Sequence, residues 1–470
     1  MSLNLLNIEC KLISFIDITN IFRSESAFDT KLDRNNSKKD GKMNTRHLLC
    51  GMAMSAALIA GAVEVPKVAI TGPWQIEVNG VKLDVPEPQV IRVVEESYKS
   101  LPVYRRGGGW NDGIALRGVS ATGCALPKAL DPYSVRMRLP DGTEMLRGKD
   151  FDYTDSWGTL GRVEGGRVSS NQEVLISYRY IPNRLDSVIK KTDGTLKFVC
   201  GIPASFCPKM PALQEGETRL LNIYTEAQTD KLTDENIFII TETAFPAESA
   251  KEQQAFIPNT MKKLQNGEHV KILAWGDSVT QCGYIPDQFR WQIQFVERLK
   301  AAYPKADIEL ISNGWGGRTI PAFLNEPEGS QYNYQRTVLD VKADLVVSEF
   351  VNDAGLPPAE WERSFNKVLN DFRAQNTEWI ILTPHYVRPD WMGLTTQNGI
   401  GIENDPRPYV AFIRKFAAEK NVAVADAAKR YGRLWRQGIP YNTLMTNTIN
   451  HPDKDGMKIF ADALMSIFGE

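Results

Sequence analysis

The sequence predicts an α/β fold class: a doubly wound, five-stranded parallel sheet in a three-layer domain, preceded by a β-sandwich-like domain. From residue 247 onward, apolar runs of strand length alternate with amphipathic segments of helix length, which is typical of a parallel sheet covered on both faces. In residues 64–246, short alternating runs are separated by clusters of Gly, Pro, Asn and Asp, and long helical periodicity is absent. A chain of 470 residues has room for both domains.

The first 63 residues are interpreted as an upstream extension followed by a secretory signal peptide. Met43-Asn-Thr-Arg-His47 supplies positive charge, residues 48–63 are mostly apolar and small, and Ala60-Gly61-Ala62 suits cleavage. The run is too short for a comfortable transmembrane helix. We therefore expect translation to start at Met43 and the bacterial protein to be secreted or periplasmic, without membrane insertion after signal removal. The alternative is a disordered tail with a small buried helix.

Residues 64–246 are expected to form a β-rich accessory domain. Asn79-Gly80 lies between two alternating runs and predicts a hairpin turn. Further alternating runs cover residues 134–139, 173–180 and 196–200. The pattern favours a β-sandwich or a small β-barrel. Its expected role is either to bind glycans or position substrate, or to support the second domain as a scaffold.

Residues 247–470 are expected to form the α/β domain. The predicted strands cover residues 271–275, 308–312, 344–350, 379–383 and 422–425. The predicted helices cover residues 249–264, 287–303, 332–341, 357–375, 406–421 and 452–468. Asn266-Gly267 is a typical helix end and marks the first transition from helix to strand.

Composition excludes several classes of protein. The formal net charge of −2 gives no basic surface for nucleic acid. Six cysteines in a chain of this length do not make a disulfide scaffold, although Cys200 and Cys207 are close enough to bridge or to remain two free thiols. No Cys/His cluster has the spacing of zinc ligands, so we expect neither a metal nor a cofactor.

Polar and glycine-rich segments follow several of the predicted strands. Gly276-Asp277-Ser278 follows the first strand, residues 313–319 the second and residues 351–353 the third, while residues 450–453 begin the last helix. Because the carboxyl ends of parallel strands meet at one edge of a sheet, where open α/β folds bind their ligands, we expect these segments to converge. A hydroxyl, a glycine-rich turn, a carboxamide and an imidazole would then lie together.

Ser278 is the candidate nucleophile, and a serine hydroxyl needs a neighbouring base to take its proton. Histidine is the side chain best suited to this task near neutral pH. The chain has four histidines: His47 lies in the presumed signal, and His269 precedes the first strand at the opposite edge of the sheet. His385 and His451 therefore remain as candidates for the base.

The four segments resemble the conserved blocks of the SGNH (GDSL-like) hydrolase superfamily, in the same order, over roughly residues 267–470. The resemblance implies a serine esterase in which Ser278 is the nucleophile and His451 the base. It also implies an oxyanion hole formed by the backbone N–H of Ser278, the backbone N–H of a block-two glycine and the side chain of Asn352. For the glycine we prefer Gly317 over Gly316.

Other residues at this edge are candidates for substrate contact. Asp277, Trp315, His385 and Arg388 form this group, with Asp277 expected mainly to order the nucleophile turn. Trp275, Trp315 and Trp391 offer flat apolar faces on which sugar rings stack, the alternative being that they pack in the core or under loops.

The sequence departs from the superfamily at the acid of the catalytic triad. That acid usually lies three residues before the histidine, where this chain has Thr448. An orienting acid fixes the imidazole tautomer and stabilises its cation. Three explanations remain open: a backbone carbonyl or an Asn side chain orients His451, a displaced Asp does so, or the enzyme is degraded.

The resemblance implies an exported carboxylic ester hydrolase that removes short acyl groups, mainly O-acetyl, from carbohydrates. The expected partner is an acetylated carbohydrate, with no nucleic acid bound. The alternatives are an esterase of the lipase or lysophospholipase type, which the absence of a long apolar lid disfavours, and a catalytically degraded glycan-binding surface protein.

Overall fold

The computed structural model describes residues 65–107, 112–227, 229–245, 250–396 and 405–469. They all lie in one compact unit, Val63–Glu470. The predicted signal peptide and start residue lie outside the described residues. Among the described residues, no helix is both long and apolar enough to cross a membrane.

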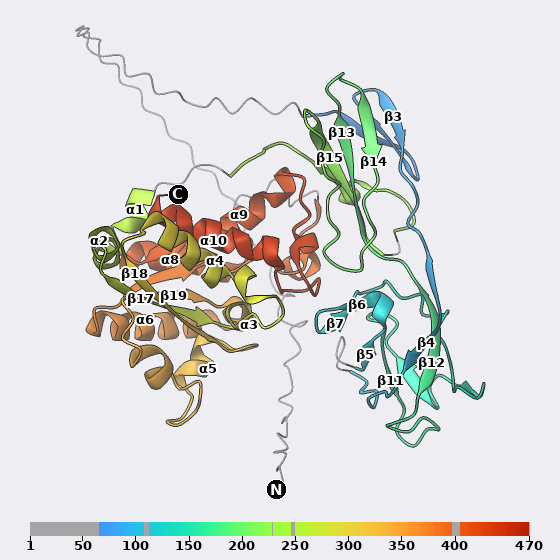
Figure 1. Ribbon diagram of the computed structural model, residues 1–470, viewed down its shortest axis with the longest axis horizontal. Coiled ribbons are helices and arrows are strands. Elements are labelled where there is room, and N and C mark those ends of the chain that lie inside the picture. The colour runs from blue at the N-terminus through green and yellow to red at the C-terminus, as the bar shows by residue number, and fades with distance from the viewer. Residues whose placement is uncertain (1–64, 108–111, 228, 246–249, 397–404, 470) are drawn as a thin grey trace, which may run out of the picture. The chain divides into compact units, whose positions relative to one another are not determined.

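The C-terminal part of the chain contains the predicted five-stranded parallel sheet (Figure 1). Its strands, in the order β18-β17-β19-β20-β21, are Asp307–Gly314, His269–Gly276, Leu345–Glu349, Glu378–Leu382 and Ala423–Ala425. Every pair is parallel. The doubly wound α/β prediction is therefore confirmed, and each predicted strand overlaps an observed one.

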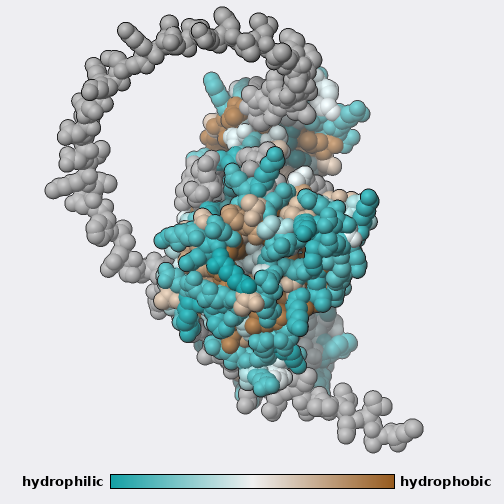
Figure 2. All heavy atoms as spheres, turned by 90° about the vertical axis from the view of Figure 1, so that its left-hand side faces the viewer, coloured by the Kyte–Doolittle hydropathy of each residue, from teal (hydrophilic) through white to brown (hydrophobic). Residues whose placement is uncertain are grey.

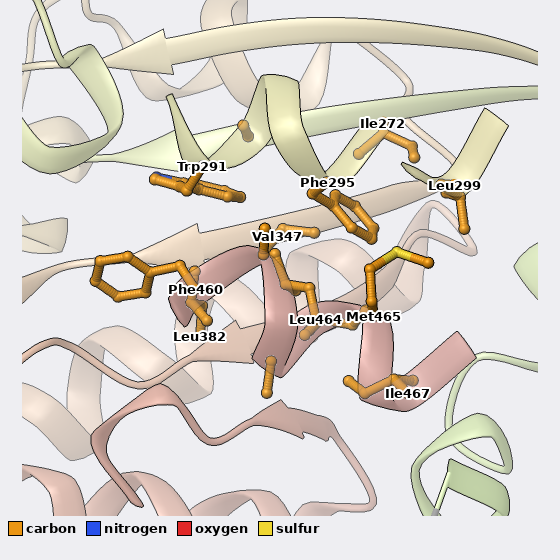
Figure 3. Packing of buried hydrophobic residues seen from close by; sticks show 14 of the residues in the cluster. Ile272, Trp291, Phe295, Leu299, Val347, Leu382, Phe460, Leu464, Met465 and Ile467 are labelled. Carbon is orange, nitrogen blue, oxygen red and sulfur yellow. The ribbon is translucent and has the colours of Figure 1, made fainter. Parts of the chain in front are cut away.

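Side chains alternate between the two faces of this sheet, and each face has its own hydrophobic core. Ile272 and Ala274 of β17 face the core formed with α2, α4 and α10, whereas Leu273 and Trp275 face the core formed with α5, α6 and α8. Figure 1 shows α4 and α10 on one side of the sheet and α6 on the other. Figure 3 shows the first core, with Phe295 of α4 facing α10.

The helices follow the predicted pattern with three differences. The α-helices are α1 Ala250–Gln254, α2 Pro258–Asn266, α3 Ser278–Gln281, α4 Trp291–Ala302, α5 Ile320–Leu324, α6 Pro358–Ala374, α8 Pro408–Lys420, α9 Ala427–Arg433 and α10 Lys454–Phe468. Pro258 divides the first predicted helix, because the residue before proline disfavours helical backbone. The helix predicted over residues 332–341 is only a π-helical turn, Gln335–Leu339, and the short helices α3, α5 and α9 were not predicted.

Residues 65–245 form antiparallel sheets, as expected. Their strands are β1 Val68–Gly72, β2 Gln75–Val78, β3 Val81–Asp84, β4 Ile91–Tyr98, β5 Ile114–Ala115, β6 Ser120–Ala121, β7 Cys124–Ala125, β8 Arg136–Arg138, β9 Glu144–Met145, β10 Phe151–Tyr153, β11 Thr159–Arg162, β12 Val174–Tyr180, β13 Arg184–Lys190, β14 Leu196–Val199, β15 Thr218–Thr225 and β16 Ile237–Ile239. The predicted turn at Asn79-Gly80 joins β2 and β3, with both residues at positive φ.

This β-rich region has two main hydrophobic cores. One lies among the sheets that contain β4, β8, β10, β11 and β12, and the other among β1–β3 and β13–β16. A β-sandwich architecture, and the boundaries 64–246 and 247–470, stay predictions. Cys200 and Cys207 are both free thiols.

The surface of the α/β part is mainly polar. On the face shown in Figure 2, hydrophilic residues predominate and hydrophobic residues form small patches. Trp391, 41% exposed, is the one large hydrophobic side chain among the described residues of the α/β part that is clearly exposed. Among the described residues, no group of three His, Cys, Asp or Glu side chains is arranged to hold a metal ion.

Candidate active site

Ser278 lies in a tight turn at the carboxyl end of β17. The strand ends at Gly276, and the short helix α3 begins at Ser278. A Cβ atom on Gly276 would lie 2.2 Å from the Thr280 hydroxyl, and one on Gly314 would lie 2.1 Å from the Gln281 nitrogen. Gly276 and Gly314 are paired across the sheet, so glycine at both strand ends lets α3 pack directly against them.

Asp277 ties this turn to the segment that follows β19. Its carboxylate is fully buried, and it accepts hydrogen bonds from the Val279 N–H at 3.0 Å and from the backbone and side-chain N–H groups of Asn352 at 3.1 and 2.9 Å. Burial raises the pKa of Asp277 to about 6, against the effect of these donors. Asp277 therefore orders the nucleophile turn, and its burial argues against a contact with substrate.

Glu349 is a second buried carboxyl group beside the turn. Its backbone carbonyl accepts from the Asp277 N–H at 3.3 Å, and both of its side-chain oxygens are buried without a hydrogen-bond partner. Burial, together with the nearby charge of Asp277, raises the pKa of Glu349 well above its ordinary value. Burial and the neighbouring carboxylate therefore both favour the protonated form of Glu349.

His451 lies within hydrogen-bond distance of Ser278. The His451 Nε2 atom is 3.2 Å from Ser278 Oγ, although the two residues are 173 positions apart in the chain. The imidazole stacks on the ring of Tyr284, with ring centroids 4.4 Å apart and planes 9° from parallel. The structure thus brings together the serine and the histidine that the sequence singled out.

The other nitrogen of His451, Nδ1, is buried and has no hydrogen-bond partner among the described residues. Thr448 stands at the position of the expected acid, and its buried hydroxyl likewise has no hydrogen-bond partner among the described residues. Its backbone φ of +56° is unusual for a β-branched residue. No acid among the described residues therefore lies on the imidazole, in agreement with the departure seen in the sequence.

His451 belongs to a loop of residues 445–452, called here the histidine loop. Met445 and Pro452 pair as an isolated antiparallel bridge, and the Thr446 N–H donates to the His451 carbonyl at 2.8 Å. Inside the loop, the Asn447 side-chain oxygen accepts from the backbone N–H groups of Ile449, Asn450 and His451 at 2.9–3.0 Å. Asn447 thus fixes the backbone on which the imidazole is mounted.

Of the candidate oxyanion donors, Gly316 lies beside Ser278. A Cβ atom on Gly316 would lie 3.7 Å from the Ser278 Cβ, but the Gly316 N–H already donates to the Gln281 side-chain oxygen at 3.0 Å. Gly317 has a left-handed backbone, with φ of +71°. The Asn352 side-chain amide donates a hydrogen bond to Asp277 at 2.9 Å. The same amide nitrogen also makes a long contact of 3.4 Å with the Arg318 carbonyl. Which glycine donates to an oxyanion stays a prediction.

Residues 274–459 match the model of the GDSL-like Lipase/Acylhydrolase family. The α/β part of the chain is therefore similar to GDSL-like hydrolases, and we call it the GDSL-like domain. The resemblance that the four sequence blocks carry is therefore confirmed for this part of the chain. No curated protein matches the sequence.

Several solved structures are similar to the GDSL-like domain. Axe2, an acetylxylan esterase from Geobacillus stearothermophilus, has 20% sequence identity over 43% of this chain and 94% of its own, with a TM-score of 0.34. LAE5, an α/β hydrolase from the metagenome of Lake Arreo, Spain, has 19% identity over 43% and 95%, with a TM-score of 0.34. A two-domain esterase (CEX) active on acetylated mannans has 16% identity over 47% and 57%, with a TM-score of 0.37.

The remaining candidates from the sequence have different surroundings in the GDSL-like domain. Trp275 is fully buried in the core, as the alternative interpretation held. Trp315 stacks on Tyr332 with centroids 4.1 Å apart, and the Arg318 guanidinium lies over its ring. His385 is fully buried and its Nε2 atom donates to the Asn450 carbonyl at 2.6 Å, so it supports the histidine loop and is not exposed to substrate.

Arg388 lies next to the histidine loop and between two tryptophans. Its backbone N–H donates to the Ile449 carbonyl at 2.8 Å. Its guanidinium pairs with Asp390 and lies 5.5 Å from the ring centroids of both Trp157 and Trp391. Arg388 therefore stays a candidate for substrate contact, together with the exposed Trp391.

Sequence reasoning missed three residues of the site: Tyr284, Glu349 and Asn447. Glu349 ends a buried strand, which is an unusual position for a carboxyl group and is the one signal that the sequence offered. Asn447 has no sequence signal beyond its closeness to His451, and Tyr284 becomes significant only once its ring is seen against the imidazole.

His385 and His451 are both largely buried, and this burial predicts how His451 titrates. Burial lowers the pKa of His451 to about 4, and burial together with the Arg407 charge lowers that of His385 to about 3. A lowered pKa means that His451 stays neutral, and able to accept a proton, at every pH above about 4. Ring-carbon NMR titration, with His451→Gln to assign the signal, should give a midpoint well below 6.5 for His451. A midpoint at or above 6.5 would contradict the buried environment.

Proposed function

We propose that the protein is an exported serine esterase that removes short acyl groups, chiefly O-acetyl, from carbohydrates. The observation that carries the proposal is the 3.2 Å separation of Ser278 Oγ and His451 Nε2 at the carboxyl edge of the parallel sheet. A serine hydroxyl next to a neutral, buried imidazole is the arrangement that acyl transfer needs. Export rests on residues 43–63 of the sequence.

In the first half of the reaction, Ser278 Oγ attacks the ester carbonyl carbon and its proton passes to His451 Nε2. The carbonyl electrons move to oxygen, and the oxyanion accepts hydrogen bonds from the backbone N–H groups of Ser278 and Gly317 and from the Asn352 amide. When the tetrahedral species collapses, the bond to the sugar oxygen breaks. That oxygen leaves as a hydroxyl after taking the proton from His451.

In the second half, water attacks the acyl group on Ser278 and gives its proton to His451. Collapse of this second tetrahedral species breaks the bond to Ser278 Oγ, which recovers the proton and releases the carboxylic acid. The protein ends in its starting state, and no electrons leave the substrate or enter it. No metal or cofactor is needed for these steps.

The imidazolium formed at each step needs stabilisation that an acid would otherwise supply. The face of Tyr284, 4.4 Å away, attracts positive charge through its ring electrons. Asn447 holds the backbone of the histidine loop, so the ring keeps its position when it is charged. We propose that His451 and Ser278 act as a dyad, with orientation supplied by this packing and by the loop backbone.

The carbohydrate substrate is supported by the surface beside the histidine loop. Trp391 is 41% exposed and its ring lies 5.5 Å from the Arg388 guanidinium, which offers an apolar face for a sugar ring next to a hydrogen-bond donor. A long apolar surface suited to fatty acyl chains is not evident among the described residues, because the exposed large hydrophobic side chains are scattered.

A second candidate function is a glycan-binding protein whose GDSL-like domain is inactive. The buried and unpartnered Nδ1 atom of His451 favours it, because an imidazole without an acid is a weaker base in a serine hydrolase. Covalent labelling separates the two functions. An active dyad reacts with a fluorophosphonate at Ser278, whereas an inactive domain binds glycans and stays unlabelled.

The proposed dyad predicts the effect of removing either member. Ser278→Ala and His451→Ala should each lower kcat for 4-nitrophenyl acetate by at least about a thousandfold, since each breaks the proton transfer. His269→Ala is the matched control, because His269 is exposed at the start of β17, where it pairs with Asp307. Its activity should stay within about twofold of the parent. Substantial activity in the purified Ser278 or His451 variant would exclude the mechanism.

The proposed substrate class predicts a split between small and polymeric substrates. Trp391→Ala should lower kcat/KM on acetylated xylan or mannan by about five- to tenfold, the equivalent of roughly 1–1.4 kcal/mol of lost ring stacking. Activity on 4-nitrophenyl acetate should stay nearly unchanged, because this ester has no sugar ring to stack.

Tyr133→Ala is the control for an exposed aromatic elsewhere, since Tyr133 is 84% exposed and lies in the β-rich region. Acetate release by this variant should match the parent on every substrate. An equal loss on polymer and aryl acetate in the Trp391 variant, or efficient cleavage of long-chain esters by the parent, would argue against the carbohydrate assignment.

A further inference from the structure

The histidine loop is held from two sides by hydrogen bonds to its backbone carbonyls. On one side, the GDSL-like domain supplies His385, which donates to the Asn450 carbonyl at 2.6 Å, and the Arg388 N–H, which donates to Ile449 at 2.8 Å. On the other side, the donors come from the β-rich region. These are a backbone N–H and a thiol of the hairpin formed by β6 and β7.

The β6–β7 hairpin contacts Thr446 and Asn447 of the histidine loop. The Thr122 N–H donates to the Thr446 carbonyl at 3.2 Å, and the Cys124 thiol donates to the Asn447 carbonyl at 3.2 Å. Burial raises the pKa of Cys124 to about 12, so the thiol keeps its proton and can act as a donor. Ile449 packs against Ala121 and Cys124, which adds an apolar contact to the two hydrogen bonds.

A second contact from the β-rich region reaches Asp453, the residue that follows the histidine loop. Lys209 donates to the side chains of Asp453 and Asp455 at 2.7 and 2.8 Å. Asp453 follows His451 and Pro452 directly and caps α10, because its other oxygen accepts from the N–H groups of Asp455 and Gly456 at 2.9 Å. Although burial opposes its charge, these partners raise the pKa of Lys209 above its ordinary value.

We propose that the β-rich region positions His451: the β6–β7 hairpin and Lys209 hold the histidine loop so that its imidazole stays within reach of Ser278. Lys209 and Cys124 are positioning residues in this proposal, since neither touches the reacting atoms. The inference deepens the proposed esterase function and rests on it. Of the two roles expected for the β-rich region, glycan binding or support of the second domain, the inference favours support, because this region holds the loop that carries His451.

The physical reason lies in the backbone of the loop. Residues 446–450 belong to no regular helix or strand, so their carbonyls cannot be satisfied within a helix or a sheet ladder. An unpaired buried carbonyl is costly, so a loop that loses its partners moves to find others. A shift of about 1 Å in a catalytic group can lower a rate about a hundredfold.

The test uses Lys209→Gln in the full chain, with Lys263→Gln as the matched control. Lys263 also pairs with one partly buried aspartate, Asp344, at 2.7 Å, but Asp344 directly precedes β19 at the opposite edge of the sheet from Ser278. Both variants lose one lysine charge, and Lys209→Gln loses two ion pairs where Lys263→Gln loses one. Only Lys209→Gln should lower kcat, by about tenfold, with KM for 4-nitrophenyl acetate nearly unchanged. Lys209→Arg, which keeps the charge, should recover most of the activity.

The hairpin is tested with Cys124→Ala and Cys124→Ser. Alanine removes the donor to Asn447, whereas serine keeps one at the same position. Cys124→Ala should lower kcat about five- to tenfold, and Cys124→Ser should stay closer to the parent. Thermal unfolding of all variants shows whether each protein is folded at the assay temperature.

A readout that needs no activity separates this proposal from the proposed function. The ring-carbon NMR signal of His451 should shift in Lys209→Gln and Cys124→Ala, and its titration midpoint should rise toward 6.5 as the ring becomes more exposed. Neither change should occur in Lys263→Gln. If the parent lacks esterase activity but these shifts appear, the esterase assignment fails and the positioning stands. Unchanged kcat and an unchanged His451 signal in both variants would overturn the positioning.

Discussion

The buried carboxylate of Asp277 is the constraint on which the rest of the site depends. It is removed from water and tolerated only because three N–H donors, one from the α3 turn and two from Asn352, surround it. Those donors belong to segments that follow two different strands, so the carboxylate fixes the position of Ser278 relative to Asn352. Glu349 lies beside it, and burial together with the Asp277 charge raises the pKa of Glu349 well above its ordinary value, which favours its protonated form.

The second half of the site is fixed in another way, by backbone groups. Among the described residues, no buried carboxylate lies beside His451. The position of His451 follows from Asn447, whose side-chain oxygen accepts hydrogen bonds from three consecutive N–H groups, and from the ring of Tyr284, on which the imidazole stacks. Burial keeps the imidazole neutral and available as a base, but it also makes the cation costly. A site of this kind depends on accurate placement of the ring more than on a charged partner.

Much of the fold and of the site could be predicted from the sequence, for identifiable physical reasons. The five strands were evident because strands buried on both faces need continuous apolar residues, and Ser278, Asn352 and His451 stand out because turns after such strands meet at one edge. The π-helical turn at Gln335–Leu339 and helix α9 were missed because tertiary packing overrode local pattern. Tyr284 and the β6–β7 donors to the histidine loop could not be found, because contacts across more than a hundred residues leave no periodic signal.

The histidine loop shows why the β-rich region and the GDSL-like domain are better regarded as one functional unit. A loop without regular secondary structure must find partners for each backbone carbonyl, and here those partners come in part from residues more than 300 positions earlier in the chain, Thr122 and Cys124. In the proposed mechanism, such contacts act directly on the backbone that carries the base. An accessory region would then govern catalysis without contributing an atom to the reaction, since a shift of about 1 Å in a catalytic group lowers a rate about a hundredfold.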